Sequence, residues 1–383
     1  MDDPYSHLAV QKLDQLKAAY ALPFVTHLVA KPTAAYQGSQ QHFDQWALRD
    51  VLTIAADYGT TFEASHRPSD DEIRRANDAL APHLAHDDFA RTAIATGSAL
   101  WTGTAIATRT HGSGATAVET GNALRQRLGH YAGGMFYFEG EWFWGIDRIR
   151  SLERRLIREG FARSTSTLCV PEPVARSSRG LAASGVVLEY FPSLRSPYTA
   201  IGHQRVADLV ARSGVTLQLR PVMPMLMRGI PAPFAKQQYI IIDAGREARE
   251  RGVPFGRIVD PFGEPVKRAF ALFPAALALD KGMAFVGAYL AAAWANGIDI
   301  TTDRGLQKVA AAAGIDWGEL RSRAQEADWQ MVLDANVEDM LDAGLWGVPS
   351  FRVTGGNDAA AFACWGQDRI WRVENEIVKR VHG

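Results

Sequence analysis

The sequence predicts an α/β protein built from two tandem domains of one architecture. The first observation is a long internal repeat, in which Asp3-Pro4-Tyr5 matches Ser196-Pro197-Tyr198 at an offset of 193 residues. The second is that the match returns near the end of each half, where residues 144–149 correspond to residues 365–370 at an offset of 221. A repeat of this length exceeds the roughly 20–50 residues of a solenoid unit. It therefore indicates a duplicated domain, with about 28 additional residues inside the second copy.

Length and composition agree with two soluble domains. The chain has 383 residues, 47% hydrophobic and 22% charged, which is typical of a globular enzyme. A net charge of −1 gives no electrostatic footprint for nucleic acid or an anionic membrane, so neither is expected as a partner. The longest apolar run, between Lys281 and Asn296, is too short to cross a bilayer and predicts a buried helix.

The first residues and the cysteines bear on the compartment. Residues 1–6 are polar and acidic and do not resemble a secretory signal. Cys169 and Cys364 stand alone, with no CxxC motif and no disulfide framework. This pattern suits a reducing environment, and we expect a cytoplasmic protein.

In the first half, apolar spacing predicts a helix over residues 4–20 and a strand over 24–29. Helices are expected at 46–58 and 70–107, followed by a hairpin at 135–144 and a closing helix at 149–159. No strand precedes the first helix, so the opening strand of this copy is either absent or replaced from elsewhere.

In the second half, the nearly continuous apolar run at 185–191 predicts a buried strand of a parallel sheet. A helix at 197–213, a strand at 215–219, a long helical stretch at about 236–345, strands at 351–353 and 362–365, and a closing helix at 369–382 follow. This order, β-α-β and then β-β-α around inserted helices, is that of a thioredoxin-like domain with a helical subdomain. The boundaries are domain 1–163, a Ser/Pro/Ala/Arg-rich linker 164–184, and domain 185–383.

Ser196 is the strongest candidate for chemistry. It follows a buried strand and begins a helix, where free backbone N–H groups and the helix dipole favour an anion. A hydroxyl at this point can hydrogen-bond a thiolate, and Arg195 would add positive potential. Ser-Pro at a helix start is also typical of a simple N-cap, and this alternative stays open.

Two further motifs stand near the end of the chain. Val348-Pro349 precedes a strand, and a cis proline there would leave backbone groups free to pair with an extended ligand, although a plain turn explains it as well. Gln367-Asp368 precedes the closing helix and could bind an α-amino acid group, or Asp368 could simply cap the helix beside Arg369.

Taken in order, these motifs resemble the DsbA-like thioredoxin superfamily, and more narrowly 2-hydroxychromene-2-carboxylate isomerases and kappa-class glutathione transferases. Arg220-Pro221, and Lys236 with Tyr239 and Asp243, add to the resemblance. It covers residues 185–380 in good order and residues 3–160 more weakly. It implies two tandem thioredoxin-like domains of DsbA type, the first degenerate, with glutathione as the cofactor and no metal. By position, Ser196 would stabilise the glutathione thiolate, and the cofactor-binding residues would be Lys236, Val348, Pro349, Gln367 and Asp368.

Ser196-Pro197-Tyr198-Thr199 stands where the resemblance places a CxxC motif, so we do not expect a disulfide oxidoreductase. The predicted activity is that of a glutathione-dependent isomerase or transferase on an aromatic or conjugated carbonyl compound. The alternatives are a non-catalytic binding or scaffold protein and an isomerase that uses no thiol. In the first copy Asp3 stands in place of the serine, and its carboxylate would repel a thiolate. This copy is therefore expected either to cover the site of the second copy or to act as a dimer partner within the same chain. The protein would then be a monomer, and a homodimer is the alternative.

Two further groups are weaker candidates. A metal could be held by the helical spacing of His83, His86, Asp87 and Asp88, but a solvated helix face is the better interpretation of these residues. Cys364 could be a reactive thiol, but a buried structural cysteine is the better interpretation.

Overall fold

The computed structural model describes residues 1–106, 112–164, 167–324, 328–357 and 360–382. The chain divides into two compact units. Unit 1 comprises Met1–Pro173 together with Ala232–Tyr239, and unit 2 comprises Val174–Pro231 together with Ile240–Gly383. Ala107, the expected end of a helical stretch, and residues 165–166 of the expected linker lie outside the described residues.

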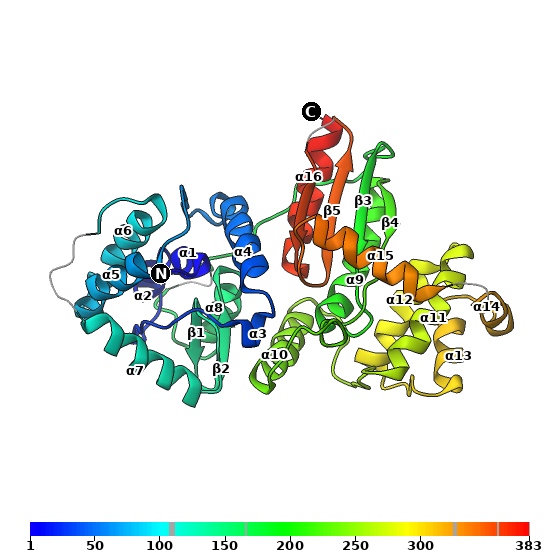
Figure 1. Ribbon diagram of the computed structural model, residues 1–383, viewed down its shortest axis with the longest axis horizontal. Helices are drawn as coiled ribbons and strands as arrows, with labels where there is room; N and C mark the ends of the chain where they lie inside the picture. The colour runs from blue at the N-terminus through cyan, green and yellow to red at the C-terminus, as the bar shows by residue number, and fades with distance from the viewer. Residues whose placement is uncertain (107–111, 165–166, 325–327, 358–359, 383) are drawn as a thin grey trace. The chain divides into compact units, whose positions relative to one another are not determined.

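A four-stranded mixed sheet forms the centre of unit 2, with strand order β4-β3-β5-β6 (Figure 1). β3 (Val186–Phe191) is parallel to β4 (Thr216–Leu219) and antiparallel to β5 (Ser350–Gly355), which pairs antiparallel with β6 (Phe362–Trp365). All four strands predicted for this half are therefore confirmed. β3 is buried at five of its six positions, as a central strand covered on both faces requires.

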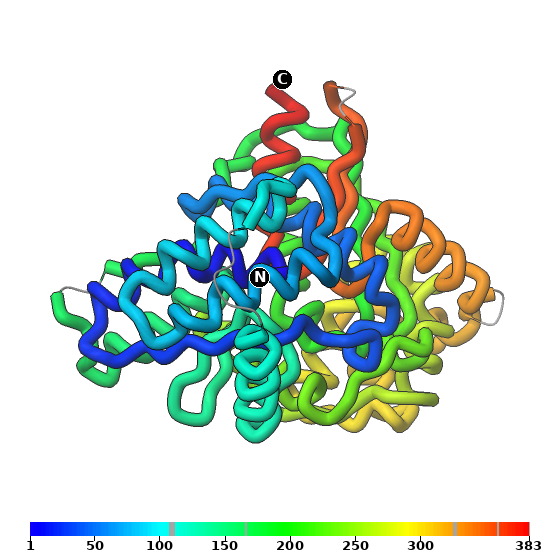
Figure 2. The backbone as a smooth tube through the Cα atoms, turned by 60° about the vertical axis from the view of Figure 1, so that its left-hand side comes forward, coloured from blue at the N-terminus to red at the C-terminus, as the bar shows by residue number. Residues whose placement is uncertain are grey.

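Helices α9 (Pro197–Ser213) and α16 (Ile370–His382) cover one face of this sheet. Leu188 and Tyr190 of β3 share a core with Leu209 of α9 and Ile377 of α16. Figure 2 shows the red α16 beside the orange β5–β6 hairpin from a second side. The alternate residue Phe191 faces the other way and packs against Val222, Met340 and Leu345, so that both faces of β3 are buried.

The predicted helical stretch between β4 and β5 is confirmed. Its elements are η4 (Met225–Arg228), α10 (Phe234–Glu250), α11 (Glu264–Ala278), α12 (Gly282–Ala291), the π-helical η5 (Ala292–Asn296), α13 (Asp303–Ala312), α14 (Trp317–Ala324) and α15 (Trp329–Asp342). The apolar run 281–296 forms α12 and η5, and Phe285 and Val286 have no exposed surface, as expected of a buried helix. Among the described residues, every helix is too short or too polar to traverse a lipid bilayer.

Unit 1 is mostly helical. Its elements are α1 (Pro4–Val10), α2 (Leu13–Ala19), α3 (Ala34–Gln37), α4 (Gln40–Ile54), η1 (Ala56–Tyr58), α5 (Asp70–Leu80), η2 (Ala81–His83), α6 (Phe89–Thr102), α7 (Ser113–Arg127), β1 (Met135–Phe138), β2 (Glu141–Trp144), η3 (Ile146–Arg148) and α8 (Ile149–Arg158). The predicted hairpin and closing helix are confirmed as β1, β2 and α8. Glu139 and Gly140 both have positive φ, 41° and 85°, which is the requirement of a two-residue type I′ turn.

Two expectations for unit 1 were wrong, and one helix was missed. Residues 4–20 form two helices, α1 and α2, instead of one. Residues 24–29 are extended but form no strand, because none of the described backbone hydrogen bonds involves them and a strand exists only through its partners. Helix α7 was not predicted; Gly121 within it passes so close to Leu28 that a Cβ would lie 1.9 Å from the Leu28 carbonyl oxygen.

The two units repeat one side-chain contact between a tyrosine and a buried aspartate. The Tyr5 hydroxyl donates to Asp50 Oδ2 over 2.6 Å, and the Tyr198 hydroxyl donates to Asp243 Oδ2 over 2.8 Å. Each tyrosine follows the proline that begins α1 or α9, and each aspartate lies 45 residues further along the chain. The contact obeys the offset of 193 found in the sequence.

The hairpins repeat as well. Met135 pairs with Trp144 in unit 1, and Ser350 pairs with Trp365 in unit 2. Just outside each pair the backbone hydrogen bond is the same: Gly145 N to Gly134 O and Gly366 N to Pro349 O, both 2.8 Å. A short 3₁₀ turn, η3 or η6 (Gln367–Arg369), then leads into the closing helix α8 or α16.

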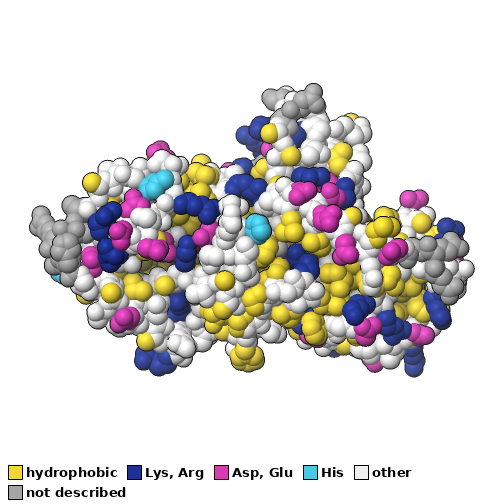
Figure 3. Space-filling model, viewed as in Figure 1, with side chains coloured by type: hydrophobic (Ala, Val, Ile, Leu, Met, Phe, Trp, Pro, Cys, Tyr) yellow, Lys and Arg dark blue, Asp and Glu magenta, His cyan; other side chains and the backbone are white. Residues whose placement is uncertain are grey.

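On the face drawn in Figure 3, basic and acidic side chains are intermixed within each unit and do not gather by sign. This distribution is consistent with the net charge of −1.

Candidate functional site

Ser196 begins helix α9 of unit 2. Its extended backbone (φ −98°, ψ 116°) places Oγ where it accepts a hydrogen bond of 3.1 Å from Thr199 N, and Pro197 occupies the first helical position. The capping role offered by the sequence is therefore realised. A hydroxyl that accepts through its oxygen still has its hydrogen to donate, so capping and donation to a ligand are compatible. The residue is 8% exposed.

The loop between β3 and α9 is rich in buried hydroxyl groups. Ser193 and Thr199 are 1% and 0% exposed, and Ser193 N donates to Thr199 Oγ1 at 3.4 Å. Ser196 N donates to Ser193 O at 3.0 Å, which closes the loop. No described group hydrogen-bonds to Ser193 Oγ, so a second hydroxyl beside Ser196 has unused capacity.

The charge of Arg195 is balanced. Its Nε and Nη2 donate to the two carboxylate oxygens of Asp260, both at 2.7 Å, and its guanidinium lies 4.8 Å from the ring centroid of Phe262. The positive potential expected from Arg195 is thus largely neutralised by Asp260, and the anion preference of this helix start depends on the α9 N–H groups.

The Val348-Pro349 peptide bond is cis. Pro349 O accepts from Gly366 N, and Val348 packs with Phe191 at the end of β3. Because β5 is antiparallel to β3 and Ser350 pairs with Phe191, the segment before β5 lies at the same sheet end as the loop leading to Ser196. The structure thus brings these two predicted segments to one end of the sheet.

Gln367 is fully buried and its amide is committed to internal partners. Nε2 donates to Glu247 Oε2 at 3.1 Å and to Asp368 Oδ1 at 2.6 Å, while Oε1 accepts from Arg205 Nη1 at 2.7 Å. The Gln367 side chain therefore ties η6 to α9 and α10. Asp368 is half-buried, whereas Gln367 and Glu247 are fully buried.

Lys236 is grouped with unit 1, whereas the other five predicted site residues belong to unit 2. Its ammonium donates to the carbonyl oxygen of Tyr36. Burial lowers the pKa of Lys236 to about 8, so the side chain remains mostly charged at neutral pH.

Sequence reasoning missed a buried charged cluster on α10. Asp243 Oδ1 accepts from Arg246 Nη2 at 2.5 Å, and Glu247 lies 3.3 Å from Arg251 Nη2; Asp243 and Glu247 are at most 1% exposed. The carboxylates reach both Tyr198 and Gln367, and so brace the start of α9 and the η6 turn. The available signal was the i,i+3 and i,i+4 spacing of opposite charges along one helix.

Asp3 takes the place of Ser196 in unit 1. It caps α1, with Oδ1 accepting from Tyr5 N at 3.1 Å and Oδ2 from Ser6 Oγ at 2.9 Å. Burial raises the pKa of Asp3 despite these hydrogen bonds. The two units therefore keep the capping geometry and differ in whether the cap can carry a negative charge.

The other weak candidates keep structural roles. Cys364 is 5% exposed within β6, as predicted for a buried structural thiol. Burial and the neighbouring Glu153 raise the pKa of Cys169 to about 11, so its thiol is protonated at neutral pH. His83 Nδ1 lies 3.1 Å from Asp88 Oδ1, and the described residues contain no group of three or more potential metal ligands.

A model of the DSBA-like thioredoxin domain matches residues 187–378, just over half of the chain. The chain belongs to this family. The match begins in β3 and ends in α16, and so spans the sheet, the helical insert and every unit 2 residue of the candidate site.

Solved structures similar to the chain include 2-hydroxychromene-2-carboxylate isomerase, at 19% identity over 50% of this chain and 95% of that chain, with a TM-score of 0.41. A putative protein disulfide isomerase from Nitrosomonas europaea aligns at 16% identity over 52% and 99% of the chains, with a TM-score of 0.42. The cytosolic disulfide reductase DsbM from Pseudomonas aeruginosa aligns at 19% identity over 51% and 99%, with a TM-score of 0.40. No curated protein matches the chain.

Proposed function

We propose that unit 2 binds glutathione at the start of α9 and acts as a glutathione-dependent isomerase or transferase on an aromatic or conjugated carbonyl compound. The observation that carries the proposal is the Ser196 hydroxyl, which caps a 17-residue helix and keeps a hydrogen to donate. A hydroxyl donor together with helix N–H groups stabilises a thiolate without supplying a protein thiol.

The sulfur in this proposal comes from the ligand. The sequence has two cysteines, and Ser196-Pro197-Tyr198-Thr199 holds neither. A bound thiolate adds to the conjugated double bond, forming a C–S bond while the π electrons move to the carbonyl oxygen. Rotation about the resulting single bond and expulsion of the thiolate restore the double bond with the opposite geometry, with no net change in protons or electrons.

The remaining site residues receive roles in the same proposal. The backbone of Val348, before Pro349, would pair with the cysteinyl part of glutathione, and Asp368 would bind the amino group of the γ-glutamyl end. Gln367 would act chiefly by orienting Asp368, because its amide donates to that carboxylate. Lys236 belongs to unit 1, and its contact with a ligand carboxylate stays a prediction of the sequence.

We also propose that the chain arose by tandem duplication and that unit 1 is a degenerate copy that does not activate a thiol. The repeated tyrosine–aspartate contact and the repeated hairpin register support this origin. The Asp3 carboxylate, where unit 2 has Ser196, would repel a thiolate at close range.

Calorimetric titration of the full chain with reduced glutathione tests the proposal, with S-methyl-glutathione as a control that lacks the thiol. Two substitutions separate chemistry from capping. Ser196→Asp keeps an oxygen acceptor for Thr199 N but adds a negative charge at a nearly buried position, so it should abolish binding of the thiolate form and lower stability at pH 7. Ser196→Ala should weaken binding and also lower stability by about 1 kcal/mol.

The matched control is Asp3→Ala, the same change at the equivalent cap of unit 1, which should leave glutathione binding unchanged. If glutathione fails to bind, or binds the wild type and Ser196→Asp equally, the site is wrong and a non-catalytic binding or scaffold role is favoured. Turnover in thiol-free buffer would instead indicate an isomerase that needs no cofactor.

A further inference from the structure

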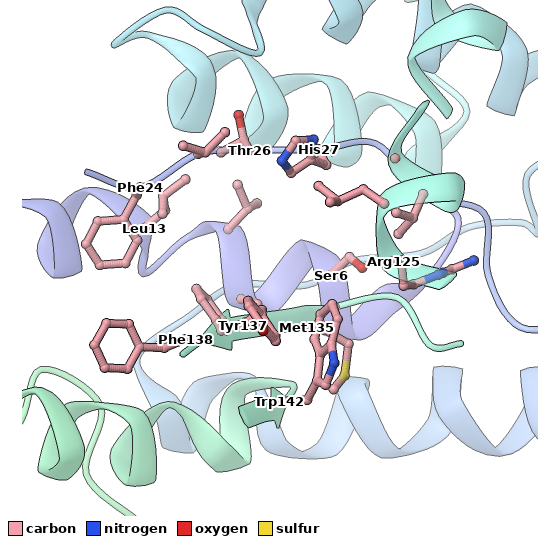
Figure 4. Close-up of a pocket in the computed structure, with 18 of the residues that line it drawn as sticks. Ser6, Leu13, Phe24, Thr26, His27, Arg125, Met135, Tyr137, Phe138 and Trp142 are labelled. Atoms are coloured by element: carbon pink, nitrogen blue, oxygen red, sulfur yellow. The ribbon is translucent and has the colours of Figure 1, made fainter. Parts of the chain in front are cut away.

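Unit 1 contains a cavity of about 430 Å³ that the proposed chemistry does not use. One side is formed by Leu22–Val29, and the other by β1 together with α1, α7 and α8. Figure 4 shows Phe24, Thr26 and His27 across the cavity from Met135, Tyr137 and Phe138. The lining is predominantly apolar.

The lining of this cavity corresponds to the neighbours of β3 in unit 2. At the offset of 193, β4 corresponds to residues 23–26 and α9 to α1. The repeated hairpin equates β5 with β1, and the closing helices equate α16 with α8. β3 lies between β4 and β5 in unit 2, so the cavity occupies the position of the counterpart of β3.

The two sides of the cavity already have the form of strands that lack a neighbour. Exposure alternates along residues 22–28: Leu22, Phe24, Thr26 and Leu28 are more buried than the residues between them, and Val25 is 75% exposed. This period of two is that of a strand. The matching residues of β4 alternate in the same phase.

β1 presents a free edge on the other side. In a hairpin closed by a two-residue turn, the residues flanking the turn hydrogen-bond each other, and the next pair does not. Phe138 and Phe136 therefore bond to β2, while Met135 and Tyr137 direct their backbone N–H and C=O groups away from it. Among the described residues, β1 pairs with β2 alone.

From this geometry we infer that unit 1 binds an extended apolar peptide of about six residues from a partner polypeptide, which completes its sheet between residues 23–26 and β1. The inference rests on the proposed duplication. Val186–Phe191, the strand of this kind in unit 2, is already paired on both edges there, and the inference assigns the strand of unit 1 to a separate polypeptide. The bound strand runs antiparallel to β1, as β3 does to β5.

The cavity also sets the chemistry of the strand. Glu189 of β3 forms ion pairs with Arg220 and Arg352 in unit 2. The corresponding positions of unit 1 hold His27 and Tyr137, which are both exposed, so a carboxylate at this position of the peptide would face solvent and lack both ion pairs. The preferred occupant is therefore defined by the apolar residues at its alternate positions, and this solvent-facing position does not select for a carboxylate.

The test is calorimetric titration of the full chain with two synthetic peptides carrying a solubilising Lys-Lys at one end. One has the sequence Gly-Val-Val-Leu-Glu-Tyr-Phe of residues 185–191, and the other has Val in place of Glu. The two peptides should bind with similar affinity, because they differ only at a position that faces solvent. A version with Pro in place of Leu should not bind, because it cannot complete the ladder.

Tyr137→Pro and Tyr137→Val form a matched pair of protein variants. Both remove the ring, but only proline removes the N–H that faces the cavity, at an edge position where proline is tolerated. Tyr137→Pro should weaken binding by about tenfold relative to Tyr137→Val. Hydrogen exchange in the wild type gives a second readout, with slowing expected at residues 24–29 and 135–137 when the peptide is added.

Absence of peptide binding, or equal binding by Tyr137→Pro and Tyr137→Val without exchange protection, would overturn the inference. Binding of an apolar dye in the cavity, without any binding of the peptides, would also overturn the inference, since it would identify a small-molecule pocket. None of these outcomes depends on glutathione binding by unit 2, so the two proposals fail separately.

Discussion

The Tyr5 hydroxyl donates a 2.6 Å hydrogen bond to the Asp50 carboxylate, and both residues are less than 5% exposed. The unit 2 counterpart, Tyr198 to Asp243, has the same spacing in the chain and nearly the same length. Both contacts fix the first turn of a helix against the next long helix, α4 or α10. The bond is present in both units although the adjacent cap is Asp3 in unit 1 and Ser196 in unit 2.

Tyr5→Phe and Tyr198→Phe should each destabilise the protein by about 1–3 kcal/mol, because each leaves a buried carboxylate without one of its donors. Urea unfolding measures the loss. Tyr137→Phe is the control, since Tyr137 is 41% exposed, and it should change stability by no more than about 0.5 kcal/mol. Equal losses of stability at all three positions would show that the tyrosine–aspartate hydrogen bonds do not contribute to stability.

Glu374 holds the segment that leads into β3. It accepts from Ser178 Oγ at 2.6 Å and from Arg212 Nε and Nη2 at 2.9 and 2.6 Å. Burial alone would raise the pKa of Glu374, but the hydrogen bonds from Arg212 and Ser178 outweigh it and hold the pKa below 4.5. The stabilisation is therefore present above pH 4.5 and is lost as pH falls through the lower folded-state value.

Glu374→Gln should lower the free energy of unfolding by about 2 kcal/mol at pH 7. The difference in this free energy between the variant and the wild type should narrow as the pH drops below 4.5. Glu319→Gln removes an exposed ion pair to Arg323 and should cost less than about 0.5 kcal/mol. Chemical denaturation at pH 7 and pH 4 distinguishes them. A gap that is independent of pH would assign the effect to packing instead of charge.

His203 is buried in its neutral form. Nε2 donates to Met283 O at 2.9 Å, and Nδ1 accepts from the Tyr190 hydroxyl at 3.3 Å. Burial lowers the pKa of His203 to about 4 from 6.5, so the unfolded chain binds one more proton between these values. Stability is full above pH 6.5 and decreases as the pH falls towards 4.

This residue alone should remove on the order of 3 kcal/mol of stability between pH 6.5 and pH 4. His203→Gln, which can still donate to Met283 O, should flatten the pH dependence of unfolding over that range. An unchanged slope in the variant would show that His203 does not control it.

Asp3 should have the opposite pH dependence. Its raised pKa means that the folded state binds the proton more tightly than the unfolded state, so the charged carboxylate destabilises unit 1 above pH 3.8. Asp3→Ser, which copies the unit 2 cap, should raise the melting temperature at pH 7 and have little effect below pH 3.8. A lower melting temperature at pH 7 would mean that the hydrogen bonds to Asp3 outweigh its burial.

Gly347 lies against the indole of Trp365, where a Cβ would approach ring atoms to 2.2 Å. Gly347→Ala should displace Trp365, shift its fluorescence and cost about 1–3 kcal/mol through overpacking. Gly185→Ala is the control, since nothing lies within 4 Å of the added carbon. If the two alanines have equal effects, the close packing beside Val348 is not what the glycine serves.

The sequence was most informative where local pattern and tertiary environment agree. The apolar run at 185–191 predicted β3, and the Glu139-Gly140 turn predicted the β1–β2 hairpin, because both features depend on residues that are adjacent in the sequence. Residues 24–29 carry an equally good strand pattern, yet they remain unpaired by any described backbone group. Pairing depends on a neighbour that periodicity cannot reveal.

The candidate site was predicted in its positions more than in its contacts. Ser196, Val348 and Pro349 could be found because a strand end and a helix start mark them. Glu247 could not be found in this way, because a charged residue in a helix is expected to be exposed. Only the fold shows that Glu247 binds Gln367. Arg195 was expected to act on a ligand but is matched by Asp260, 65 residues away in the chain.

The two cysteines can be followed separately by their reaction with a thiol reagent. Cys169 lies in unit 1 with its thiol held protonated, and Cys364 lies on β6 of unit 2. A thiol reagent can reach buried Cys364 only when its surroundings open transiently, whereas half-buried Cys169 is accessible and reacts slowly because its thiol is protonated. Labelling kinetics followed by mass spectrometry would therefore time the opening of unit 2 around Cys364, with Cys169 as an internal reference, in the unmodified protein and under native conditions.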